Sequence, residues 1–124
     1  MRVAERVMAW ERAPAGSHVE ITLLPATAMR RANRRATGRR GLTDVIAYTL
    51  PQPDGRLLGD VYICPAAAAA AGTAPGGAGL REELVRLAVH GTLHVLGYDH
   101  PEGAGRTRSR MWQLQERYVK RLHR

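Results

Sequence analysis

The chain contains 124 residues, a length typical of a single domain built around one hydrophobic core. Hydrophobic residues make up 44% and charged residues 24% of it, which excludes a wholly disordered protein. No apolar run approaches the roughly 20 residues of a membrane-spanning helix, and residues 1–12 lack the apolar core of a secretory signal. Because Cys64 is the only cysteine and cannot form an internal disulfide, we expect a cytoplasmic protein.

The charge of the chain indicates a polyanionic partner. The formal net charge is +8, and of 19 basic residues only Lys120 is a lysine. An excess of this size favours nucleic acid first and an anionic membrane surface second. The abundance of arginine and alanine also fits a GC-rich genome, whose codons favour both residues. Charge alone therefore does not separate a nucleic-acid-binding protein from the product of a GC-rich gene.

The predicted elements begin with an amphipathic helix, in which Val3, Val7 and Trp10 recur at helical spacing. Alternating β-branched and polar residues predict strands, two of which are joined by a turn at 51–55 and should form a hairpin. We expect helices over 2–12, 26–36, 65–71, 80–96 and 106–123, and strands over 19–24, 43–50 and 58–64. This order predicts a single α+β domain over residues 1–124, in which helices pack on a small mixed sheet.

The predicted helix over 80–96 is apolar on nearly all sides, which is typical of a central, buried helix. Its polar residues fall in one narrow stripe that contains Glu83, Arg86, His90 and His94. Buried histidines need a partner that satisfies their ring nitrogens. The stripe therefore marks the candidate functional site of the chain.

Three histidines follow one another at the spacing H-x3-H-x5-H. His90 and His94 stand four residues apart on one helix face, so both imidazoles project in the same direction. Gly97 can end the helix in a left-handed conformation, after which the chain turns back and His100 can approach the same point. Three neutral imidazoles around one open position form the arrangement of catalytic zinc, with water as the fourth ligand. The spacing predicts one Zn2+ per chain.

Two other interpretations of these histidines stay open. In the first, they are core residues whose ring nitrogens bond to backbone carbonyls. In the second, the chain is a metalloprotease, because the metzincin motif HExxHxxGxxH has the same spacing. A protease of that class uses the glutamate after the first histidine as its general base, and here that position is Gly91. A glycine cannot accept a proton, which disfavours peptide hydrolysis.

The segment HGTLHVLGYDH over 90–100 resembles the signature of the YbeY family of bacterial rRNA maturation endoribonucleases, H-G-x-L-H-L-x-G-Y-D-H. Val95 stands where that pattern has leucine. Upstream, TDVI over 43–46 resembles the family's T-D-V-L, and LGDVYIC over 58–64 resembles its L-G-D-I-x-I-C. Asn33-Arg34-Arg35 resembles an asparagine-containing helix of the family, and the similarity runs from about residue 19 to residue 122.

The resemblance implies a metal-dependent hydrolase domain in which His90, His94 and His100 hold Zn2+. It also implies single-strand-specific RNA cleavage, a role in 16S rRNA 3′-end maturation and ribosome quality control, and the ribosomal small subunit as partner. It implies no membrane and no particular protein partner. Family members usually have a strand before the first helix, so we expect the N-terminal strand to be missing from this chain.

One departure concerns a catalytic arginine. Many family members carry an arginine six residues before the T-D-V threonine, and here that position is Thr37. Arg39 or Arg40, in the same loop, is a candidate replacement that would act beside a zinc-bound water. The alternative function is a non-catalytic zinc-containing ribosome-assembly factor that binds rRNA.

Further candidate residues lie elsewhere in the sequence. A basic segment is a candidate RNA-binding surface, since arginine forks suit phosphate oxygens, although a solvated helix face would have the same composition. Its members are Arg30, Arg31, Arg34, Arg35, Arg39 and Arg40. Asp99 and Asp60 are candidates to accept the free N–H of a zinc-bound imidazole, with a local turn hydrogen bond as the alternative for Asp99.

Overall fold

The computed structural model describes residues 2–70, 79–99, 105 and 109–123. Its elements are the helices α1 (Val3–Trp10), α2 (Ala26–Thr37), α3 (Pro65–Ala70), α4 (Leu80–Val95) and α5 (Arg110–Leu122), and the strands β1 (His18–Leu23), β2 (Val45–Pro51) and β3 (Leu57–Ile63). The order of elements and the α+β class agree with the sequence prediction. None of the helices within the described residues is long and apolar enough to cross a membrane.

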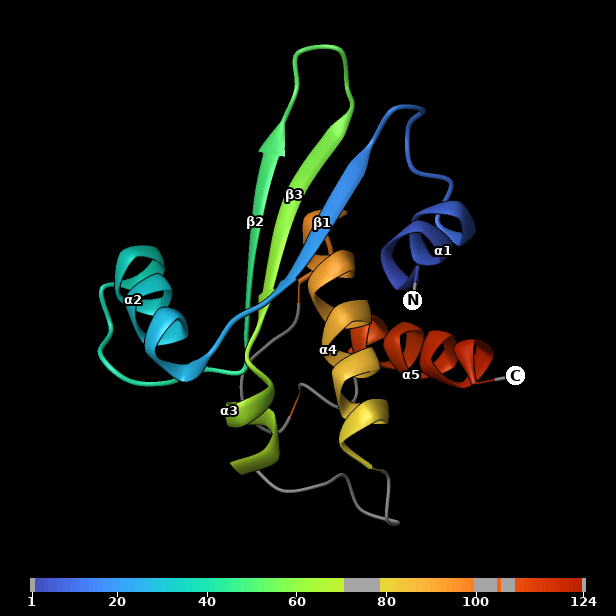
Figure 1. Ribbon diagram of the computed structural model, residues 1–124. Helices are drawn as coiled ribbons and strands as arrows, with labels where there is room; N and C mark the ends of the chain where they lie inside the picture. The colour runs from blue at the N-terminus through green and yellow to red at the C-terminus, as the bar shows by residue number, and fades with distance from the viewer. Residues whose placement is uncertain (1, 71–78, 100–104, 106–108, 124) are drawn as a thin grey trace.

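The three strands form one mixed sheet in the order β1-β3-β2 (Figure 1). The central strand β3 pairs parallel with β1, with Val19 beside Gly59, and antiparallel with β2, with Tyr48 beside Asp60. The predicted hairpin of β2 and β3 is confirmed. Because side chains alternate along a strand, Gly59, Val61 and Ile63 share one face of the sheet, and Asp60 and Tyr62 share the other.

Helix α4 packs against the first of these faces, and two glycines allow the close approach. A Cβ atom added at Gly91 would lie 2.5 Å from Val61 Cγ1, and one added at Gly59 would lie 2.5 Å from Val95 Cγ1. Val61 and Val95 are almost wholly buried, so neither side chain has space to retreat. The glycines therefore fix the distance between α4 and β3, and with it the height of the histidines above the sheet.

Helices α1 and α5 cover the remaining sides of α4, as Figure 1 shows, and α2 lies on the other side of the sheet. Glu11 links three parts of the chain, because its carboxylate accepts hydrogen bonds from the hydroxyls of Tyr98 and Tyr118. The Trp10 ring packs on Tyr118, with the ring centroids 5.0 Å apart. These contacts hold α1 and α5 against the end of α4.

The start of α5 differs from the prediction of a helix from residue 106. The helix begins at Arg110, because Ser109 is its N-cap and accepts a hydrogen bond from the Trp112 N–H at 3.1 Å. Residues 106–108 lie outside the described part of the chain. Within the helix, Met111, Tyr118 and Val119 are buried and form its apolar side.

Candidate functional site

His90 and His94 lie in the last turns of α4 and face each other. The two Nε2 atoms are 3.1 Å apart, and the ring planes are inclined by 81°. His90 is buried and His94 half-buried, so the pair lies at the edge of the core rather than in open solvent. The i, i+4 spacing on the helix thus brings two imidazole nitrogens to one point.

The opposite ring nitrogens of both histidines are hydrogen-bonded to oxygen atoms. His90 Nδ1 lies 2.7 Å from Gln115 Oε1, and His94 Nδ1 lies 3.0 Å from the Tyr98 carbonyl oxygen. An oxygen acceptor requires an N–H, so each neutral ring carries its proton on Nδ1 and its lone pair on Nε2. The two Nε2 atoms therefore face one shared position, which a proton or a metal cation can occupy.

This geometry fits a zinc ion. Zn–N bonds of about 2.0–2.1 Å in a tetrahedral site separate two ligand nitrogens by about 3.3 Å, close to the spacing of the two Nε2 atoms. Hydrogen bonds from the distal nitrogens to oxygen are also the usual support of zinc-bound histidines. The third predicted ligand, His100, lies outside the described residues, and within those residues no group of three potential ligands forms.

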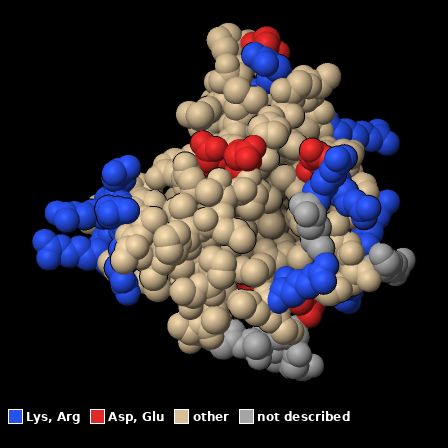
Figure 2. Space-filling view, viewed as in Figure 1, with Lys and Arg blue, Asp and Glu red and all other residues tan. Residues whose placement is uncertain are grey.

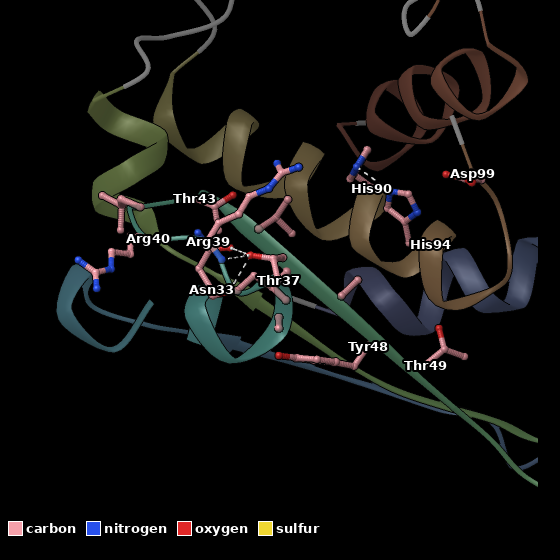
Figure 3. A pocket seen from close by; sticks show the side chains of 15 residues that line it. Asn33, Thr37, Arg39, Arg40, Thr43, Tyr48, Thr49, His90, His94 and Asp99 are labelled. Carbon is pink, nitrogen blue, oxygen red and sulfur yellow. Dashed lines mark hydrogen bonds between the residues drawn. The ribbon is translucent and has the colours of Figure 1, made fainter. Parts of the chain in front are cut away.

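A cavity of about 870 Å³ opens in front of the histidine pair (Figure 3). His90, His94 and Asp99 line one side of it, and Arg39 and Arg40 line the other. Tyr48 and Thr49 of β2 also line the cavity, and Figure 3 shows them below the histidines. The structure thus brings both candidate catalytic arginines and one candidate carboxylate to the cavity of the predicted metal ligands.

Hydrogen bonds from Thr37 hold the loop that carries these arginines, which spans residues 38–44 between α2 and β2 and is called the arginine loop. The Thr37 hydroxyl lies 2.9 Å from the Asn33 carbonyl oxygen, to which it donates, and accepts from the Arg39 N–H at 3.1 Å. The buried Asn33 amide donates to the Gly41 carbonyl oxygen at 3.2 Å. Gly38 ends α2 with a left-handed φ of 73°. Thr37 therefore fixes the path of the loop.

The other candidate carboxylate, Asp60, lies on the sheet face that points away from α4. It lines a separate cavity of about 500 Å³ with Arg31 and Arg35. The structure therefore does not bring Asp60 to the histidine pair. The acceptors that do reach the histidines are the Gln115 side chain, which we did not predict, and the Tyr98 carbonyl, a backbone acceptor of the kind considered in the alternative interpretation. A glutamine on the otherwise apolar side of α5 was the signal for Gln115.

Four of the six arginines of the predicted basic surface lie on α2. Arg30, Arg31, Arg34 and Arg35 are all exposed, and Figure 2 shows basic side chains gathered over this helix. The neighbouring sheet face carries acidic residues instead, since Glu20 and Asp60 are paired in register on β1 and β3. Figure 2 shows acidic side chains over the strands beside the basic group. The positive surface is thus bounded on the sheet side.

Comparison with known proteins identifies the family of this arrangement. A family model described as Endoribonuclease YbeY matches residues 1–123. Proteins named Endoribonuclease YbeY from Mycobacterium ulcerans and Moorella thermoacetica are 34% and 38% identical to this chain; each alignment covers 84% of the chain and, respectively, 63% and 73% of the relative. The relative from Micrococcus luteus is 34% identical over 96% of this chain and 79% of its own length.

A solved structure shows the same fold. The alignment with the solution structure of a Thermotoga maritima protein covers 95% of this chain and 75% of that protein's chain, with a TM-score of 0.62 and 26% sequence identity. The chain spans less than two thirds of the Mycobacterium ulcerans relative, at 63%. The family match includes every described element from α1 to α5, with the paired histidines and the arginine loop. The chain therefore belongs to the YbeY endoribonuclease family.

Proposed function

We propose that this protein is a zinc-dependent endoribonuclease that cleaves single-stranded RNA. The observation that carries the proposal is the convergence of the His90 and His94 Nε2 atoms, 3.1 Å apart, at the edge of a cavity lined by arginines. The family match and the relatives named as endoribonucleases support it. A basic protein with no acid at Gly91 also fits RNA better than a peptide as substrate.

His90, His94 and His100 would hold one Zn2+ per chain and leave a fourth position open. When bound there, zinc would polarise a phosphoryl oxygen or lower the pKa of a water molecule towards about 7. The chain itself contributes orientation, because the Gln115 side chain and the Tyr98 carbonyl hold the two rings with Nε2 facing the cavity. The cavity is lined both by α4 and by the loop that carries Arg39 and Arg40, so a phosphate bound in it would contact both sides.

Arg39 and Arg40 would stabilise negative charge on the phosphate during cleavage. Both line the cavity opposite the histidines, and the loop they occupy is held by Thr37 and Asn33. A preorganised guanidinium aimed at developing charge is worth about two to three orders of magnitude in rate. This is the role that we assign in place of the arginine absent at Thr37.

Arg30, Arg31, Arg34 and Arg35 would bind the RNA backbone beyond the cavity. They are exposed on one helix that leads into the arginine loop, so phosphates can follow α2 to the cavity. Glu20 and Asp60 on the open sheet face would repel phosphate and direct the strand along α2. Contacts of this kind bind RNA with little sequence preference.

The biological setting is proposed from the family. The chain would act in the cytoplasm on rRNA, in 16S rRNA 3′-end maturation and ribosome quality control, with the ribosomal small subunit as partner. A second candidate function is a non-catalytic assembly factor that binds zinc and rRNA. Thr37, at the position of the family's arginine, is the observation that favours it.

Zinc content and RNA cleavage test the proposal together. The wild-type protein, His94→Ala and the matched control His18→Ala, which changes an exposed histidine, are analysed for zinc and for cleavage of a labelled single-stranded RNA. A duplex of the same sequence serves as the second substrate. We expect about one zinc per chain and single-strand cleavage for the wild type and the control, and neither for His94→Ala.

The arginine variants separate the two candidate functions. We expect Arg39→Ala or Arg40→Ala to reduce single-turnover cleavage roughly a hundredfold, with zinc content unchanged and RNA binding reduced much less. Full zinc occupancy in His94→Ala would overturn the ligand assignment. A wild-type protein that binds zinc and RNA but does not cleave RNA would establish the assembly factor instead.

A further inference from the structure

A chain of hydrogen bonds leads from the histidine pair across the α4–α5 interface. His90 Nδ1 lies 2.7 Å from Gln115 Oε1, and Gln115 Nε2 lies 3.0 Å from Glu116 Oε2. Arg86 Nε lies 2.9 Å from the same Glu116 oxygen, and Arg86 Nη2 lies 3.0 Å from Glu116 Oε1. Gln115 and Glu116 of α5 therefore connect one predicted metal ligand on α4 to an ion cluster around Arg86, which lies four residues before His90 on the same helix.

Arg86 fixes the far end of this chain. Its guanidinium forms two hydrogen bonds with the Glu116 carboxylate and further ion pairs with Glu82 and Glu83 on its own helix. Its side chain is only 14% exposed, so these bonds are weakly screened by solvent. Burial raises the pKa of Glu116, but hydrogen bonds from Arg86 and Gln115 outweigh this and lower it overall. Glu116 is therefore a carboxylate at neutral pH.

The ionisation of Glu116 determines the direction of every other bond. A carboxylate only accepts hydrogen bonds, so the group that Gln115 presents to it must be the amide N–H2. The Gln115 oxygen then faces His90 and can only accept. The proton of a neutral His90 must accordingly lie on Nδ1, which leaves the lone pair on Nε2. Neither the amide orientation nor the tautomer is free to change while Glu116 is held.

We propose that Gln115 is a positioning residue that, oriented by Glu116 and Arg86, holds His90 in the tautomer and ring orientation needed to bind metal. This inference rests on the proposed function of His90 as a ligand. The burial of Gln115 supports it, because only 1% of the residue is exposed and a buried amide is costly unless both its ends are bonded. His94 needs no such side chain, since its Nδ1 donates to a backbone carbonyl.

The test compares Gln115→Met with Gln113→Met, which makes the same change on the exposed side of α5. Two measurements are made: the ring tautomer of His90 in the metal-free protein, by 15N NMR, and the Zn2+ affinity, by competition with a chromophoric chelator. Loss of a supporting partner typically weakens metal binding about 10–100-fold. We expect this loss and a mixed His90 tautomer in Gln115→Met, and wild-type behaviour in Gln113→Met.

A second variant keeps the test decisive if Gln115→Met does not fold. Glu116→Gln preserves size and offers an amide that can donate, which allows Gln115 to turn its own N–H2 towards His90. We expect a smaller loss of Zn2+ affinity and a partial loss of the Nδ1–H tautomer. Wild-type affinity and tautomer in folded Gln115→Met, or in Glu116→Gln if Gln115→Met does not fold, would overturn the assignment.

The same measurements separate this inference from the proposed function. If the wild-type protein binds no Zn2+ but His90 loses its Nδ1–H tautomer in Gln115→Met, the metal site is wrong and the orienting role of Gln115 stands. If Zn2+ binds with equal affinity to wild-type and Gln115→Met proteins, the metal site stands and the positioning role is wrong.

Discussion

Gly91→Ala tests whether the close approach of α4 and β3 is a constraint on this fold. The new methyl carbon would lie 2.5 Å from Val61 Cγ1 and 3.0 Å from Val61 Cγ2, whereas an ordinary contact begins at 3.4 Å. Because Gly59 meets Val95 in the same way, the helix is held at two points and cannot tilt to relieve one of them. Overpacking of this kind costs about 1–3 kcal/mol.

The intrinsic helix preference acts in the opposite direction. Alanine is favoured over glycine inside a helix by about 1 kcal/mol. Because the contact at Gly59 prevents the helix from moving away, we expect a packing cost of about 2–3 kcal/mol. After the gain in helix preference is subtracted, the free energy of unfolding should fall by about 1–2 kcal/mol. With a urea m value of roughly 2 kcal/mol/M, the midpoint would fall by about 0.5–1 M.

Urea unfolding of a double-mutant cycle measures this term directly. Val61→Ala removes the two methyl groups that the new carbon would meet, so Gly91→Ala should be less damaging in that background. We expect a coupling of at least about 1 kcal/mol between the two positions. A Gly91→Ala protein that is as stable as the wild type, or more stable, would show that the close contact imposes nothing on the sequence.

The remaining predictions concern the hydrogen bond between Tyr118 and Glu11, the exposed arginines of α2 and the loop that carries Arg39 and Arg40. Burial and the hydrogen bond to Glu11 raise the pKa of Tyr118 to about 12, so the stabilisation from this group is complete below a pH of about 10 and is lost as the pH rises towards 12. Tyr118→Phe should therefore reduce the loss of urea stability at alkaline pH, and an unchanged loss would contradict its assignment to Tyr118. The double variant Arg34→Ala/Arg35→Ala should reduce the slope of log affinity for single-stranded RNA against log salt by about 1.4, and an unchanged slope would return these arginines to a solvated helix face. Thr37→Val removes the hydroxyl hydrogen bonds to Asn33 and Arg39, so it should slow RNA cleavage without releasing zinc. Cleavage at the wild-type rate would show that the loop does not need these hydrogen bonds.

Most of the fold could be predicted because its elements carry local signals. Val3, Val7 and Trp10 mark α1, and the nearly all-apolar pattern of residues 80–96 correctly predicts a buried central helix. The start of α5 was not predicted correctly, because it depends on a single capping hydrogen bond, from the Trp112 N–H to the Ser109 hydroxyl. The parallel pairing of β1 with β3 also has no local signal, since its partners are 40 residues apart in the chain.

The candidate site was predictable where spacing along one helix sets the geometry. His90 and His94 are brought together by the α-helical repeat alone, and the predicted family is confirmed by the match over residues 1–123. Gln115 could not be found in this way, because its contact with His90 depends on how α5 crosses α4. Asp60 illustrates the reverse difficulty: a carboxylate in a family-like segment faces away from α4 because strand residues alternate between faces.

The position of α4 in the chain has a consequence for folding during synthesis. The sheet is complete once β3 has been made, yet the face that contains Val61 and Ile63 is covered by a helix that ends at Val95. A ribosome therefore releases the hairpin of β2 and β3 before the helix that covers it. Until α4 follows, the nascent chain presents an apolar sheet face to its surroundings, which is the kind of surface that chaperones bind and that promotes aggregation. The helix that carries His90 and His94 is thus also the element that completes the core, so these two histidines come together at the same step that ends the exposure of the sheet.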